Sequence, residues 1–148
     1  MTCGMSTLQM NVPEGEGQPP VTMEIMAVSN GSYLGAKDGE DMIARTLQLM
    51  AAFPFTNGTF LAPYQTIKLW DEFGGDSPMN SFILAFPLQV DVPRLCSCTP
   101  GAQIVTTIMP ISKEERELAV SKGSEALFDL FDEHKVSDLF DLDRKPVI

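Results

Sequence analysis

Histidine, tryptophan and cysteine are all scarce in this sequence of 148 residues, which holds one His, one Trp and three Cys. A catalytic pair of Ser with His, or of Cys with His, would have to use His134. No nucleophile elbow surrounds a serine, and neither of the phosphate-binding glycine patterns, GxxxxGKS/T and GxGxxG, occurs. These absences disfavour most catalytic classes, and we expect a protein that is not an enzyme and has no cofactor.

The three cysteines do not have the spacing of a disulfide framework. Cys96 and Cys98 are separated by one residue, and Cys3 lies far from both in the sequence. A structural zinc site usually takes four N or S ligands in two pairs, so Cys3 and His134 would have to complete one. We interpret the cysteines as ordinary thiols and expect no bound metal. The alternative hypothesis is a small enzyme, or a thiol- or metal-dependent protein, that uses Cys96 and Cys98 with His134.

Basic side chains are half as numerous as acidic ones, with 10 Lys and Arg against 20 Asp and Glu and a net charge of −10. Such a charge repels phosphate backbones and anionic lipid, so we expect neither nucleic acid nor a membrane as a partner. It favours a basic protein partner, although it can also serve simply to keep a protein dispersed. Long apolar runs and the basic start of a signal peptide are missing too, which together with the odd cysteine count predicts a cytoplasmic protein.

The residues that are present predict an α/β fold, with a mixed β-sheet flanked by helices in one domain. Hydrophobic residues make up 44% of the sequence, which is enough for a continuous core. In the segment VTMEIMAV (21–28), apolar and polar residues alternate as in a strand, so that Val21, Met23, Ile25 and Ala27 can face a core while Thr22 and Glu24 face water.

A first helix is predicted to begin near Asp38, because Ile43, Leu47 and Met50 recur at helical spacing. It should end at Phe53-Pro54, since proline disfavours helical geometry in the residue before it.

Two nearly continuous apolar runs, 81–90 and 102–111, predict strands at the centre of the sheet. Ser112 and Glu115 then have the spacing of a helix capping box. A further helix follows, and 136–148 is expected to pack back in a partly extended form. Four residues of that helix share one face at helical spacing: Leu127, Leu130, Phe131 and His134.

Acidic pairs such as Glu114 with Glu115, or Asp141 with Asp143, could act as acid and base or bind a cation. In a chain with 20 acids we interpret them as parts of a solvated surface.

A predicted surface loop that mixes aromatic and acidic side chains is the candidate interaction surface. Aromatic side chains anchor many protein interfaces, and acids suit a basic partner. The candidate residues are Tyr64, Trp70, Asp71, Glu72 and Phe73.

Three segments, TCGMSTLQMNVPEG (2–15), MIARTLQLMAAFPFTNGTFLAPYQTI (42–67) and CTPGAQIVTTIMPISKEERELAVSKGSEALFDLF (98–131), resemble the suppressor of fused domain family, including its bacterial members. Their order along the chain matches the family, and the end, DLDRKPVI (141–148), fits as well. Two departures stand out. Thr2 comes sooner than in most members, which have several tens of residues before it, and Pro63-Tyr64-Gln65-Thr66-Ile67 replaces a Gly-Asp-His-Ile-like element.

This resemblance implies a single suppressor of fused-like domain over 1–148 that lacks an N-terminal segment usual in the family. It implies a mixed sheet with flanking helices, and a non-catalytic role in binding protein partners. Many bacterial members are immunity proteins that neutralise toxins, so a stoichiometric toxin antagonist is one expectation. A missing strand partner would also leave an open sheet edge, through which the protein could form a homo-oligomer.

Overall fold

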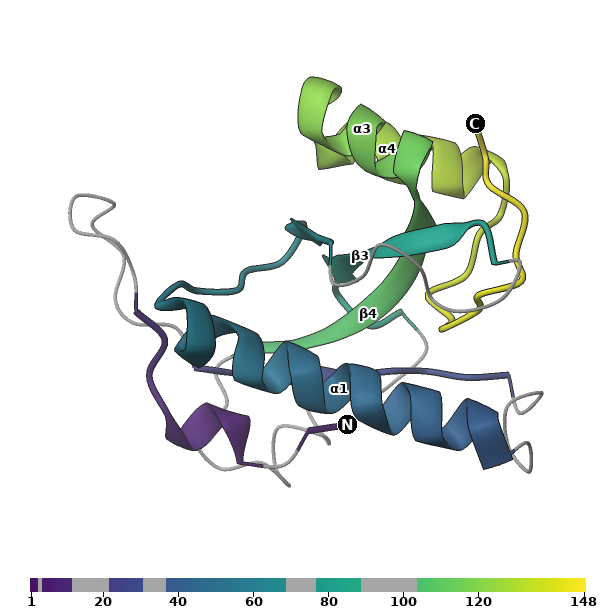
Figure 1. The fold of residues 1–148 in the computed structure, drawn as a ribbon. Helices are drawn as coiled ribbons and strands as arrows, with labels where there is room; N and C mark the ends of the chain where they lie inside the picture. Colours follow the sequence, from purple (N-terminus) through teal and green to yellow (C-terminus); the bar gives the residue numbers. More distant parts are fainter. Residues whose placement is uncertain (3, 12–21, 31–36, 69–76, 89–103) are drawn as a thin grey trace.

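The computed structural model describes residues 1–2, 4–11, 22–30, 37–68, 77–88 and 104–148, with the side chains of 37–41 excepted. Figure 1 shows a sheet between two helical layers, with α1 on one face and α3 and α4 on the other. The fold is therefore α/β with a mixed sheet, as predicted. Its elements are η1 (Met5–Thr7), β1 (Met23–Met26), α1 (Lys37–Asn57), β2 (Thr66–Ile67), β3 (Met79–Ala85), β4 (Ile104–Ser112), α3 (Lys113–Lys122) and α4 (Ser124–Glu133).

The sheet has the strand order β1-β4-β3-β2, so residues 81–85 and 104–111 of the two apolar runs lie at its centre, as expected. Residues 89–90 and 102–103 of these runs are outside the described residues. β1 pairs with β4 in parallel, whereas β3 is antiparallel to both β4 and β2. β4 changes partner along its length: its first half pairs with β1 and its second half with β3. Thr107 lies at the changeover, opposite both Met26 and Ala85. β4 is the long curved strand of Figure 1.

Two apolar cores lie on opposite faces of this sheet. Phe82, Leu84 and Ile108 point into the core that α1 covers, while Ile83 and Met109 point into the core beneath α3 and α4. The alternation follows from the two-residue period of a strand, which sends successive side chains to opposite faces. Continuous apolar runs are needed here because both faces of β3 and β4 are covered.

Helix α1 does not end at Phe53, as the sequence predicted, but continues to Asn57 with Pro54 inside it. Pro54 is buried and lies in the last turn, where its missing N–H removes a single helical hydrogen bond and only three helical residues follow it. Side chains supply donors to carbonyls near the helix end: the Thr56 hydroxyl donates to Ala52 at 2.5 Å and the Asn57 amide to Phe53 at 2.9 Å. A proline this close to the end is therefore accommodated.

Strand β1 is buried at all four positions, so the prediction that Glu24 faces water was wrong. The N-terminal segment covers the strand: the Thr2 backbone donates to the Ile25 carbonyl at 2.7 Å, and the Ile25 N–H donates to the Thr2 hydroxyl at 2.9 Å. The Glu24 carboxylate accepts hydrogen bonds from the Thr2 hydroxyl, from the backbone of Gly4 and from both the backbone and hydroxyl of Ser6. Val21 lies outside the described residues.

Helix α3 begins with the predicted capping box, in which Ser112 and Glu115 exchange hydrogen bonds. In α4, Leu127 and Phe131 are buried as expected, but His134 is exposed. His134 falls just beyond the helix, and Lys135 turns the chain with a φ of 55°. The expectation that His134 packs on the helix face was therefore wrong.

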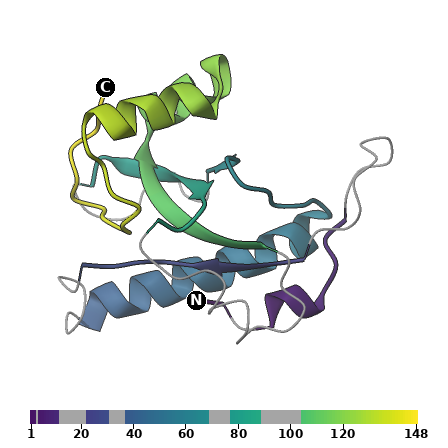
Figure 2. The same cartoon turned by 180° about the vertical axis from the view of Figure 1, so that it is seen from behind.

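The C-terminal tail, residues 136–148, runs from α4 past the sheet and returns toward the helices α3 and α4 (Figures 1 and 2). Leu139 forms a parallel bridge with Val28, and the Phe140 N–H donates to the Val28 carbonyl at 2.6 Å. In the described part of the chain, none of the helices is long and apolar enough to cross a membrane.

Candidate functional site

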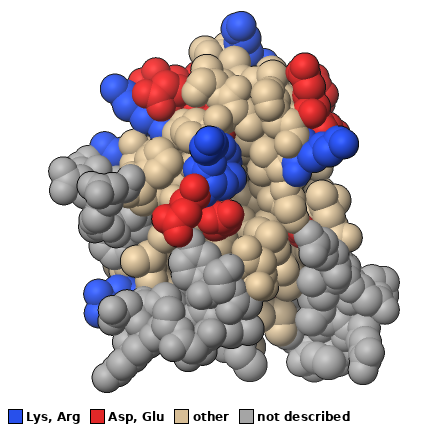
Figure 3. All heavy atoms as spheres, turned by 90° about the vertical axis from the view of Figure 1, so that its right-hand side faces the viewer, with Lys and Arg blue, Asp and Glu red and all other residues tan. Residues whose placement is uncertain are grey.

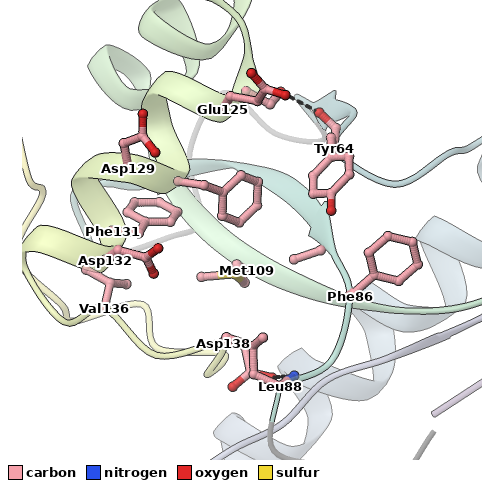
Figure 4. Close-up of a pocket in the computed structure, with 13 residues that line it drawn as sticks. Tyr64, Phe86, Leu88, Met109, Glu125, Asp129, Phe131, Asp132, Val136 and Asp138 are labelled. Atoms are coloured by element: carbon pink, nitrogen blue, oxygen red, sulfur yellow. Dashed lines mark hydrogen bonds between the residues drawn. The ribbon is translucent and has the colours of Figure 1, made fainter.

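A hollow of about 690 Å³ opens between α4, the end of β3 and the second half of β4. Figure 4 shows it with Met109 behind, α4 along one side and the tail segment on another. Apolar and aromatic side chains form most of its lining, namely Tyr64, Ala85, Phe86, Leu88, Met109, Phe128, Phe131 and Val136. The polar lining consists of Ser124, Glu125, Asp129, Asp132 and Asp138.

The aromatic rings of the hollow meet edge to face. The Tyr64 ring lies 5.7 Å from Phe86 and 5.4 Å from Phe128, at interplanar angles of 79° and 80°. Phe128 in turn meets Phe131 at 5.8 Å and 87°. Edge-to-face pairs at these distances stabilise one another, so the rings hold a defined arrangement. Yet Tyr64 is 49% exposed, Phe86 47% and Leu88 77%, which leaves a large apolar surface in contact with solvent.

Backbone contacts fix the position of Tyr64. Its N–H donates to the Leu84 carbonyl at 2.7 Å, and its carbonyl accepts from the Ser124 hydroxyl at 2.7 Å. Tyr64 also has a φ of 69°, a left-handed conformation that is unfavourable for a bulky residue. The contacts with β3 and α4 thus hold the ring above the hollow at some conformational cost.

Among the described residues, the charged side chains that line the hollow are all acidic. Glu125, Asp129 and Asp132 are exposed on α4, whereas Asp138 is 1% exposed. Among the described residues, none of these four carboxylates lies within 4.0 Å of a Lys or Arg nitrogen. Elsewhere the signs mix: acidic and basic side chains lie near one another on the face drawn in Figure 3.

Arg144 connects the C-terminal tail to α3 and α4. Its guanidinium lies over the Phe131 ring, 5.0 Å from the centroid. It donates to both oxygens of Glu115, at 2.7 and 2.6 Å, and to the Pro110 carbonyl at 2.8 Å. Phe131 therefore both lines the hollow and contacts the buried ion pair of Arg144 and Glu115.

The Glu115 side chain is fully buried, so its interpretation as part of a solvated surface was wrong. Besides Arg144, it accepts from the backbones of Ser112 at 2.8 Å and Val147 at 2.9 Å. Burial by itself raises the pKa of Glu115, but the hydrogen bonds and the charge of Arg144 outweigh it and hold the pKa below 4.5. The carboxylate stays charged inside the protein because donors surround it.

Glu24 is a second buried carboxylate of this kind. Burial raises its pKa, and the hydrogen bonds from Thr2, Ser6 and Gly4 lower it further than burial raises it, so that it lies below 4.5. These contacts bind the N-terminal segment to β1. We therefore assign Glu24 and Glu115 structural roles.

Of the predicted interaction residues, Tyr64 lies in the hollow, whereas Trp70, Asp71, Glu72 and Phe73 fall outside the described residues. The three cysteines fall outside them as well. Across the described ranges there is no group of three or more potential His, Cys, Asp or Glu metal ligands. Apart from Tyr64, sequence reasoning named none of the residues that line the hollow as site residues, and it missed Phe86, Leu88 and Asp138 among them. Pro87, between Phe86 and Leu88, could have signalled the end of a buried strand.

Residues 1–145 match the family described as suppressor of fused protein. The chain belongs to this family. A search of curated protein sequences returned no match. Among solved structures, the chain resembles one described as the Sufu-Fu complex crystal structure, with a TM-score of 0.55 and 17% identity. The likeness covers 70% of this chain and 44% of that one, so the chain spans less than half of the solved structure's chain.

Two segments that carried the resemblance meet in this suppressor of fused domain. The strand-to-helix stretch around Pro110, Ser112 and Glu115 accepts the hydrogen bonds of Arg144, which belongs to DLDRKPVI (141–148). The joint between β4 and α3 thus also anchors the tail. We infer that these sequence markers of the family are structural.

Proposed function

We propose that this domain is non-catalytic and acts by binding a protein partner in a stoichiometric complex, and that the hollow beside α4 is its docking surface. The observation that carries the proposal is the exposed aromatic and aliphatic surface of Tyr64, Phe86 and Leu88, in which backbone hydrogen bonds hold Tyr64 and Leu88 in place. Rigid aromatic side chains are the usual anchors of protein interfaces. Family membership agrees, since the solved relative is itself a complex of two proteins by its description.

The charge around the hollow suits a basic partner. Three exposed acids on α4 and the buried Asp138 line it together with apolar side chains. Complementary charge speeds encounter and disfavours acidic competitors. Helix α4 contributes one hydroxyl side chain to the described lining, that of Ser124. Because this hydroxyl donates to the Tyr64 carbonyl, it suits a structural role better than the role of a nucleophile.

The more specific version of this proposal is a bacterial immunity protein that neutralises a basic toxin in the cytoplasm. It rests on the acidic charge of the chain and on the roles of bacterial family members. Co-expression with the basic proteins encoded beside its gene tests it: this chain should restore growth to cells that one of those proteins inhibits. Growth inhibition unchanged by this chain, for every such neighbour, would remove the toxin version.

Self-association through a sheet edge has less support. The Thr2 backbone already meets the outer edge of β1 at Ile25, and Phe140 meets Val28 beyond it. Light scattering over a wide concentration range checks this, and a constant monomer mass would exclude the homo-oligomer.

Affinity capture from the native host tests the docking surface. We expect the wild-type chain to capture a specific protein, and Phe86→Ser or Leu88→Ser to lose it, because each change removes an exposed apolar anchor. Val120→Ser is the matched control, because Val120 is also an exposed apolar residue, 68% accessible, but lies on α3 outside the hollow. Equal capture by the Phe86 and Leu88 variants would show that the hollow is not the docking surface.

A further inference from the structure

Asp138 is a buried carboxylate that lines the hollow, and the described residues place no cation beside it. It is 1% exposed, and its Oδ2 accepts from the Leu88 backbone N–H at 2.8 Å. The other oxygen, Oδ1, has the Ser137 hydroxyl at 3.5 Å, the outer limit for a hydrogen bond. Among the described residues no Lys or Arg nitrogen lies within 4.0 Å of it. Buried charges in proteins are normally paired, so this carboxylate is poised to accept a cation.

The surroundings of Asp138 define what kind of cation fits. Leu88 and Phe86 provide apolar and aromatic surface close to it, and Tyr64 adds a second ring. On the α4 side, Asp132 directs its carboxylate over the hollow (Figure 4). A long side chain fits here if its stem is apolar, to contact the apolar and aromatic surface, and its end is positively charged, to pair with the carboxylate.

We propose that the hollow binds an arginine side chain of the partner protein, with its guanidinium paired to Asp138 and its plane against the Phe86 ring. The proposal rests on the proposed function, because it names the group by which a basic partner is recognised at the same site. Arginine fits better than lysine, since its planar guanidinium is weakly hydrated, stacks on aromatic faces and forks to a carboxylate.

The protein already contains this arrangement once, at Phe131. There, Arg144 lies over the Phe131 ring and donates to both oxygens of Glu115. Aromatic ring, guanidinium and buried carboxylate together form that internal contact. The hollow offers the rings and the carboxylate of the same arrangement, and the partner supplies the guanidinium.

Titration of the whole 15N-labelled chain with three small probes tests the proposal by NMR. The probes are the N-acetyl, N-methylamide derivatives of arginine, of lysine and of citrulline, the last being a neutral analogue of arginine. We expect the arginine derivative to shift the amide signals of Leu88 and Asp138, and to bind about tenfold more tightly than the citrulline derivative, because the charged hydrogen bond is lost. Equal binding of citrulline, or equal binding of lysine, would overturn the assignment to arginine.

Variants place the binding at Asp138. Asp138→Asn keeps an oxygen for the Leu88 N–H but removes the negative charge. It should weaken the binding of the arginine derivative about tenfold. Glu133→Gln is the charge-matched control, because Glu133 is an exposed acid on α4 outside the hollow, and should change nothing. If Asp138→Asn fails to fold, Phe86→Leu replaces it as the test variant. It should weaken the binding of the arginine derivative several-fold, because it removes one aromatic face. Unchanged binding in the variant that folds would overturn the proposal.

The partner captured from the host separates this inference from the proposed function. Loss of capture in Phe86→Ser but full capture in Asp138→Asn would overturn the arginine contact and leave the docking surface standing. Full capture in Phe86→Ser would overturn the docking surface itself. Loss of capture in both variants, with the Glu133→Gln and Val120→Ser controls intact, is the result we expect.

Discussion

Arg144 and Glu115 form a two-pronged ion pair, with Nη1 at 2.7 Å from Oε1 and Nη2 at 2.6 Å from Oε2. The Glu115 side chain is fully buried and that of Arg144 is 10% exposed, so water hardly screens the pair. Through this contact the last residues of the chain are bound to the start of α3.

Replacing Arg144 with alanine should strongly destabilise the protein. The change leaves the Glu115 carboxylate buried without its counter-charge, and the loss of one partner of a buried pair costs about 3–5 kcal/mol. Urea unfolding followed by circular dichroism measures the effect. Lys113→Ala is the control, because its pair with Glu117 is exposed on α3, and it should cost no more than about 0.5 kcal/mol. Similar costs for the two variants would contradict a structural role for the Arg144 contact.

Stability should fall in acid because Glu24 and Glu115 have pKa values below 4.5 in the folded protein. As the pH falls, the unfolded chain takes up protons on these two groups before the folded protein does. Their contribution to the free energy of unfolding is therefore present above pH 4.5 and is lost as the pH falls through the folded-state pKa values. The free energy of unfolding, measured from about pH 6 to pH 3, should decline below about pH 4.5, and less steeply in Glu115→Gln. An equally steep decline in Glu115→Gln would show that other groups cause it.

Glu24→Gln should loosen the N-terminal segment before the rest of the fold. The neutral side chain has one oxygen to accept hydrogen bonds and presents an NH₂ group to the surrounding donors, at a cost of about 2 kcal/mol. Hydrogen exchange should speed up at the amides of Gly4 and Ser6, which donate to Glu24. Glu117→Gln is the control, since Glu117 is exposed on α3. Unchanged exchange at Gly4 and Ser6 would contradict this role of Glu24.

Tyr64→Gly should be more stable than Tyr64→Ala. Both remove the ring, but the φ of 69° costs alanine about 1 kcal/mol and glycine almost nothing. Thermal unfolding of the two variants gives the comparison. Tyr64→Phe is the control that keeps the ring, and it should stay within about 0.5 kcal/mol of the wild type. A more stable alanine variant would mean that the backbone at position 64 relaxes easily.

Local patterns in the sequence predict much of this fold. The apolar runs of β3 and β4 indicate strands covered on both faces, and the Ser112 and Glu115 spacing marks the start of α3. Such features depend on residues that are close together in the chain, so they can be recognised in a single sequence. Pro54 misled because its effect depends on its place within the helix, and the sequence alone did not show that α1 continues to Asn57.

The buried carboxylates and the hollow depend instead on contacts between distant segments. Glu24 is buried because Thr2 and Ser6 supply donors, and Glu115 because Arg144 reaches it from the tail. Alternation and charge patterns do not reveal such partners. Tyr64 was predicted as an interaction residue from its type, but its neighbours Phe86 and Phe128 come from other elements that meet only in the folded chain.

The position of β4 between two partners also bears on the order in which the protein folds. Its second half, with β3, α3 and α4, builds one core from the C-terminal half of the sequence. Its first half pairs with β1, which is distant in the sequence. The pairing of Met23 with Ile104 joins residues about eighty positions apart, and closing such a long loop costs conformational entropy. The half of the domain that carries most of the hollow can therefore form early, and the N-terminal half would be added to it as the slow, final step of folding.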